Sequence, residues 1–206
     1  MSKGIRQYID ELEGILLSMA GCMDLLYKAF LRNDTESLEA VTCTMRNISE
    51  RMPEVTDNIA RHSKHQPDVA HLISVPSTVG RIHADLLTVA RVVEKKVRED
   101  ILFSDLAIEE LSYMLERTRD IVLHLEDMLM SGSELGKVHV LAVCATLEAK
   151  AEKFAALHQD RLVEGLCMPK SSGLFIEALW AMKNIAWLSH DIARVLGVGQ
   201  PVRCEI

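Results

Sequence analysis

Histidines and carboxylates are the residues of this chain whose types and spacing could hold a metal ion. His62 and His65 lie three residues apart, which is compatible with one face of a helix. Neutral imidazoles of this kind suit zinc or nickel. Asp85 and His190 come from distant segments and would join such a site only if the fold brought them together. The simpler interpretation is exposed turn histidines, with Asp85 paired to Arg81 one helical turn earlier.

Other chemistries lack their usual motifs. The sequence contains no G-x-S-x-G, no H-E-x-x-H and no glycine-rich phosphate loop between a strand and a helix. None of the eight histidines has a glutamate three positions before it, so the E-x-x-H pair of ferritin-like oxidases is missing. The five cysteines are scattered, without a C-x-x-C pair. We therefore expect no enzyme activity and no cofactor. The alternative is a metal- or ligand-dependent enzyme whose site is shifted to the space between two helical bundles.

Helical periodicity organises the elements that would position these residues. Apolar residues recur at steps of three and four, and the first such stripe comprises Ile5, Ile9, Leu12, Leu16, Met19, Met23, Leu26 and Phe30. Two successions of three such stripes predict an all-α fold of two tandem three-helix bundles, residues 1–99 and 100–206. Asp34 or Thr35 is the expected N-cap of the second helix and Ser104 that of the fourth. Pro53 predicts a kink or a restart inside the second helix.

Charge and composition limit the partners and the location. A net charge of −7 argues against a nucleic-acid binder, which normally needs a basic surface. The start "MSKGIRQYIDELEG" has acids where a signal peptide has its apolar region. Charge-free runs last roughly a dozen residues, against the ~20 that span a bilayer, so we expect a cytoplasmic chain that is not membrane-spanning. "EKKVRED", residues 94–100, predicts a solvated helix end. Exposed helical faces are compatible with a homodimer.

The second half resembles the PhoU family, and most closely the PhoU-like domains associated with sodium/phosphate cotransporters. Three stretches carry the resemblance: "EKKVREDILFSDLAIEELSYMLERTRDIV", the more specific "HQDRLVEGLCMPKSSGLF", and the last helix with its Ile-Ala pairs at 185–186 and 192–193. The residues that match the family pattern are Phe103, Ser104, His158, Arg161, Gly165, Cys167, Pro169 and Gly173. The resemblance covers residues 94–197 well and the first half mainly through its layout.

The resemblance also implies where a metal would be bound. In that family the third helix of each bundle carries a glutamate and an aspartate four residues apart that bind metal. The aligned positions in this chain are Gly80 and Ala84 in the first half and Lys183 and Trp187 in the second. Glycine and alanine have no ligand atom, a protonated lysine has no lone pair, and an indole offers only an N–H donor. We therefore expect no metal at these positions.

What the resemblance implies about function is regulation of phosphate uptake and phosphate homeostasis. Such a protein would dock on a phosphate transporter or on its sensor kinase at the cytoplasmic face of the membrane. Since the expected metal positions have lost their ligands, we expect the chain to act by binding its partner and not by catalysing a reaction.

Overall fold

The structure is a computed structural model that describes residues 3–64, 67–131 and 133–196. These ranges contain six long α-helices and one 3₁₀ segment, with no strand, which confirms the all-α prediction for the described part of the chain. The elements in chain order are α1 (Lys3–Arg32), α2 (Thr35–Ser63), the 3₁₀ segment η1 (Pro67–Ser74), α3 (Val75–Arg98), α4 (Asp105–Ser131), α5 (Glu134–Val163) and α6 (Pro169–Leu196).

Short polar connections end one helix and begin the next. Asn33 has a left-handed φ of 53°, and the carboxylate of Asp34 then accepts hydrogen bonds from backbone N–H groups in the first turn of α2. The hydroxyl of Ser104 accepts a hydrogen bond from the backbone N–H of Ala107 at 3.3 Å. Both predicted N-caps are therefore confirmed. Pro53 lies inside α2 and does not end it, so the alternative of a restart there is wrong.

The helix end at residues 94–100 is less solvated than its charges suggest. Lys96 is buried, with its Nζ 2.8 Å from the backbone oxygen of Phe30 and 2.5 Å from Oδ1 of Asn33. The ammonium thus satisfies a carbonyl group at the C-terminal end of α1, where helical carbonyls lack partners. Lys95 and Arg98 are exposed as expected. The prediction of a solvated end is wrong for Lys96 because tertiary packing places α1 against this turn.

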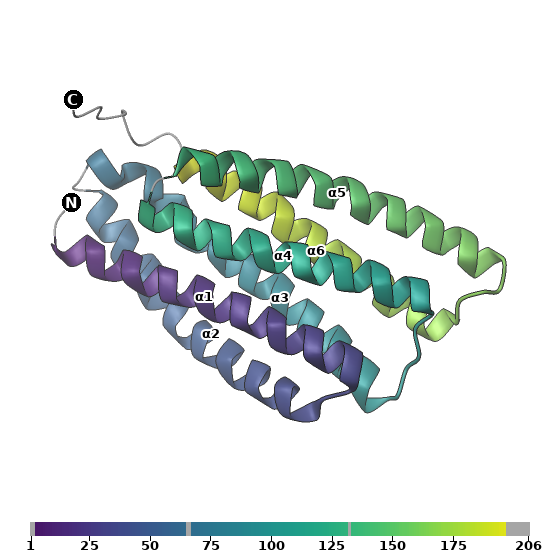
Figure 1. The fold of residues 1–206 in the computed structure, drawn as a ribbon. Coiled ribbons are helices and arrows are strands. Elements are labelled where there is room, and N and C mark those ends of the chain that lie inside the picture. Colours follow the sequence, from purple (N-terminus) through teal and green to yellow (C-terminus); the bar gives the residue numbers. More distant parts are fainter. Residues whose placement is uncertain (1–2, 65–66, 132, 197–206) are drawn as a thin grey trace.

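Four helices form the centre of the fold, and one further helix lies on each side of them (Figure 1). Helices α1 and α4 lie in front in this view, α3 and α6 lie behind them, and α2 and α5 run along opposite sides. Helix α1 packs against α2, α3 and α4, and α6 packs against α3, α4 and α5. Close packing therefore crosses between the two halves of the sequence as well as staying within each half.

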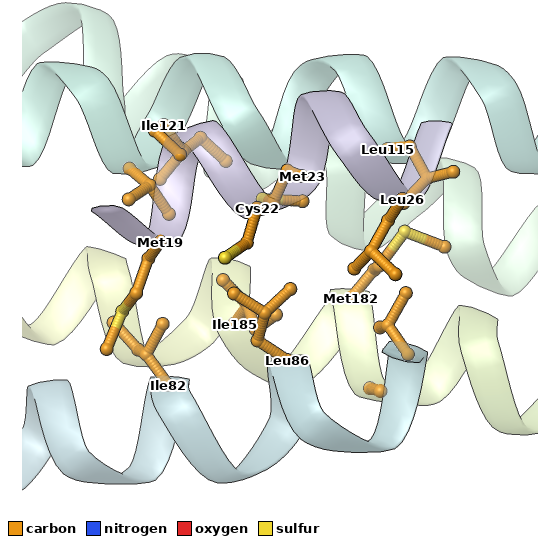
Figure 2. Packing of buried hydrophobic residues seen from close by; sticks show 14 of the residues in the cluster. Met19, Cys22, Met23, Leu26, Ile82, Leu86, Leu115, Ile121, Met182 and Ile185 are labelled. Atoms are coloured by element: carbon orange, nitrogen blue, oxygen red, sulfur yellow. The ribbon is translucent and has the colours of Figure 1, made fainter. Parts of the chain in front are cut away.

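The hydrophobic core is continuous through the central helices. Figure 2 shows Met23 of α1, Ile82 of α3, Leu115 of α4, and Met182 and Ile185 of α6 pointing into the space between these four helices, at successive positions along the bundle. Each of these side chains is no more than 3% exposed. All belong to a single cluster of buried hydrophobic residues. The three helices of each half do not enclose separate cores, so the division at residue 99 stays a prediction.

Helix α1 is long and apolar enough to span a membrane by length and composition. Its segment Arg6–Arg32 has a window with a mean hydropathy of 1.4, half of which is buried inside the bundle. Its apolar residues include Ile15, Leu16 and Met19, which are at most 1% exposed in the core. A core helix and a membrane span share this composition because both bury apolar side chains, so the absence of a membrane span stays a prediction.

Candidate docking surface on α3 and α6

Helix α3, from the first half of the sequence, packs against α6, from the second half. The guanidinium carbon of Arg81 lies 5.6 Å from the centre of the Trp187 ring. Four residues further along α3, the carboxyl group of Asp85 accepts a hydrogen bond from the side chain of Asn184. The pairing of rising numbers on α3 with falling numbers on α6 shows that the two helices run antiparallel.

The four positions aligned with the family's metal ligands lie on the flanks of this surface. A Cβ added to Gly80 would lie 3.7 Å from Cε of Met52, so this position faces α2. Lys183 points the other way, and its Nζ lies 2.7 Å from Oε1 of Glu152 on α5. Ala84 and Trp187 follow one turn later on each helix and are both exposed. Gly80 therefore lies beside α2 and Lys183 beside α5, whereas Trp187 lies beside Arg81 of α3.

Lys183 supplies a positive charge where the resemblance would place a metal ion. Its ammonium binds the carboxylate of Glu152 and lies 4.8 Å from the centre of the Trp180 ring. A carboxylate and an aromatic face both attract a cation. A protonated lysine satisfies these neighbours permanently, whereas a metal would need additional anionic ligands. The Lys183 ammonium therefore lies between Glu152 and Trp180, and the absence of a metal at this position stays a prediction.

Two partly exposed tryptophans project from α6 on this surface. Trp180 and Trp187 are 42% and 47% exposed, and they are two helical turns apart on the same stripe. On the α3 side, Arg81, Arg91 and Lys95 are exposed. Arg81 contacts Trp187, whereas Arg91 also lines a groove against α2 with Val41 and Met45. Within the described residues, no carboxylate forms an ion pair with any of these three cations. We call Trp180, Trp187, Arg81, Arg91 and Lys95 the tryptophan face.

Asp85 lies at the centre of the tryptophan face and is half-buried between the helices. Burial raises the pKa of its carboxyl group, while the hydrogen bond from Asn184 and the charge of Arg81 act in the opposite direction. The surroundings therefore favour the negative charge less than water does. Asp85 links the two helices through Asn184. The exposed Glu177 and the partly exposed Asp191 lie on α6 within one turn of Trp180 and Trp187, so the surface carries charges of both signs.

The other predicted metal candidates are not gathered into a site in the described residues. The ring of His62 lies 5.4 Å from that of Tyr8, and its Nδ1 is 2.8 Å from the backbone oxygen of Asn58. His190 has its Nδ1 3.9 Å from a carboxylate oxygen of the adjacent Asp191. His65 lies outside the described residues. Residues 3–64, 67–131 and 133–196 contain no group of three histidines, cysteines or carboxylates placed to hold a metal.

Residues of the family pattern gather at the end of the molecule where α5 turns into α6. Arg161 donates to both carboxylate oxygens of Glu110 on α4, at 3.0 and 2.5 Å, and the two side chains are 12% and 10% exposed. His158 stacks on Phe175 with ring centres 4.2 Å apart. Cys167 lies in the connection, with its Sγ 3.8 Å from Nδ1 of His158. Sequence analysis placed Arg161 in the pattern but did not predict Glu110 as its partner.

The remaining residues of the pattern shape this end of the fold. Phe103 is buried against Phe30, with ring centres 5.6 Å apart in an edge arrangement. Gly165 has a φ of +73°, which a glycine adopts without steric cost at the end of a helix. Pro169 begins α6, and Gly173 is exposed one turn later. These positions serve the turn and the packing, whereas Glu110, His158, Arg161 and Cys167 carry functional groups.

Comparisons with known proteins add no identification. No protein-family model, curated protein or solved structure matches the chain.

Proposed function

We propose that this protein is a PhoU-like regulator of phosphate uptake, built as two related three-helix halves, that acts by docking on a phosphate transporter. The phosphate assignment rests on the sequence resemblance of the second half. The docking assignment rests on one observation, the tryptophan face. At positions where the family places metal-binding carboxylates, Lys183 is paired with Glu152 and Trp187 projects beside Arg81.

The chemistry of the tryptophan face defines the partner segment. Tryptophan and arginine carry a large share of binding energy at protein interfaces, because they offer wide apolar contact together with polar groups. Arg81, Arg91 and Lys95 are positive on a chain with a net charge of −7. An acidic segment with apolar side chains, exposed on the cytoplasmic side of the transporter, complements this face. Its apolar groups would cover Trp180 and Trp187, and its carboxylates would meet the cations.

A binding measurement tests this proposal. The full chain is titrated against the phosphate transporter of its source organism in lipid nanodiscs. We expect Trp187→Ala to weaken binding by about tenfold or more, as the loss of an interface tryptophan does. Arg91→Glu should slow association and reduce its dependence on salt. Circular dichroism should show that each variant is folded, because both substituted side chains are exposed.

Leu17 provides a matched control on α1, on the other side of the central helices. It is 44% exposed, close to the exposure of the two tryptophans, and Leu17→Ala should leave binding unchanged. Equal binding by all variants would show that the tryptophan face is not the docking surface. Absence of binding to the transporter, with binding to the sensor kinase instead, would show that the choice of partner is wrong.

A further inference from the structure

Cys167 lies beside two polar side chains, His158 and Arg161, that the docking proposal does not use. Its sulfur is partly exposed and 3.8 Å from Nδ1 of His158, which is itself 2% exposed. Phe175 holds this imidazole from one side at an interplanar angle of 17°. The Nε2 atom of His158 is buried without a partner in the described residues. The ring is therefore fixed, with one nitrogen directed to the thiol.

Arg161 brings a positive charge to the same sulfur. The hydrogen bonds with Glu110, and to a smaller extent the interaction with Cys167, raise the pKa of the guanidinium. Burial, followed by the charge of Arg161, lowers the pKa of His158, so this imidazole is neutral at neutral pH and its Nδ1 can face the thiol as a hydrogen-bond acceptor. The Nε atom of Arg161 is buried and has no partner in the described residues. A proton acceptor and a fixed cation thus flank one thiol.

We infer that Cys167 is a peroxide-reactive thiol, oxidised to a sulfenic acid at a site formed with His158 and Arg161. His158 takes the thiol proton, and the sulfur attacks one oxygen of hydrogen peroxide. The S–O bond forms as the O–O bond breaks. Sulfur loses two electrons to the peroxide, and the departing hydroxide takes the proton from His158 to leave as water. Arg161 stabilises the negative charge that passes from sulfur to oxygen.

The other described cysteines lack this combination. Burial raises the pKa of the Cys22 thiol to about 11 and that of the Cys144 thiol to about 12, which leaves both unreactive near neutral pH. Cys43 is exposed on α2 and has Arg46 one turn away, but no imidazole contacts it among the described residues. Cys43 therefore controls for access and for a nearby arginine within the same molecule.

The experiment measures the oxidation of each cysteine in the folded chain carrying Cys204→Ser. Hydrogen peroxide is added with dimedone, which traps sulfenic acids, and labelled peptides are quantified by mass spectrometry over time. We expect the labelling of Cys167 to be about tenfold faster than that of Cys43, because an imidazole nitrogen lies 3.8 Å from the Cys167 sulfur and can take its proton during the reaction. His158→Gln should reduce the rate at Cys167 toward that of Cys43 without changing Cys43.

Equal or slower labelling of Cys167 in the unsubstituted site would overturn the inference. So would a His158→Gln variant that is folded by circular dichroism and keeps the full rate. If this variant does not fold, the ratio of Cys167 to Cys43 in the parent chain decides the question alone. The inference does not depend on the proposed function, because neither the assay nor its outcome involves a transporter.

Discussion

The ion pair between Glu110 and Arg161 offers the sharpest test of how the second half is held together. The pair joins α4 to α5, with N–O distances of 3.0 and 2.5 Å, and both side chains are about nine-tenths buried. Arg161→Met removes the guanidinium but keeps most of the apolar stem. The carboxylate of Glu110 then remains in a buried position with no partner of opposite charge.

The expected cost follows from two limits. Breaking a buried ion pair by removing one partner costs about 3–5 kcal/mol, because the other charge is left uncompensated. Alternatively, the unpaired Glu110 can take up a proton. Protonating a glutamate of ordinary pKa at pH 7 costs about 3.5 kcal/mol, so the loss of stability should not exceed about this value. We therefore expect Arg161→Met to lower the free energy of unfolding by about 3 kcal/mol, measured by urea denaturation with circular dichroism.

Two comparisons make this prediction refutable. Combining Arg161→Met with Glu110→Leu removes both charges and should restore stability to within about 1 kcal/mol of the parent chain. Arg117 pairs with Asp120 on the surface, where the side chains are 43% and 33% exposed. Arg117→Met should cost less than about 1 kcal/mol. If Arg161→Met and Arg117→Met cost the same, burial of the Glu110 pair does not carry the energy assigned to it.

Two further predictions concern pH and metal binding. Burial is the main cause that lowers the pKa of His83 and of His158 below the ordinary 6.5. As the pH falls below about 6.5, these histidines therefore bind protons more readily in the unfolded chain than in the folded chain. The free energy of unfolding should then fall by up to about 1.4 kcal/mol per histidine for each pH unit below ~6.5, and a urea midpoint that stays constant from about pH 7.5 to about pH 5.5 would contradict this. Lys183→Glu combined with Trp187→Asp places two new carboxylates on α6 near Glu152, whose Oε1 now lies 2.7 Å from Nζ of Lys183. We expect this variant to bind about one divalent cation per chain by calorimetry with Mn²⁺, and equal uptake by the parent chain would refute the replacement of a metal by lysine.

Local features of the sequence predicted the helices because the forces that form them act over a few residues. The three-and-four spacing of apolar residues predicted α1. The capping residues Asp34 and Ser104 predicted where α2 and α4 begin. Pro53 left two alternatives open. The structure rules out the restart, because α2 continues through Pro53, with Met52 and Val55 buried on either side of it.

The candidate site was only half predictable. Alignment on the family pattern identified Lys183 and Trp187 as poor metal ligands from side-chain chemistry alone. It could not show that Lys183 reaches Glu152, 31 residues earlier, or that Trp187 meets Arg81 in the other half of the chain. Lys96 shows the same limit, because its contact with Phe30 spans 66 residues.

The sequence by itself thus determined which segments are helical, where several of them begin, and which side chains can ligate, donate or accept. Only the tertiary structure decided that α3 meets α6 across the halves, that Glu110 pairs with Arg161, and that His158 faces Cys167. The physical reason is that helix formation and capping depend on neighbours within about one turn. Pairing between helices depends instead on how the apolar stripes of the whole chain pack into one core, and that choice determines which polar groups are left together.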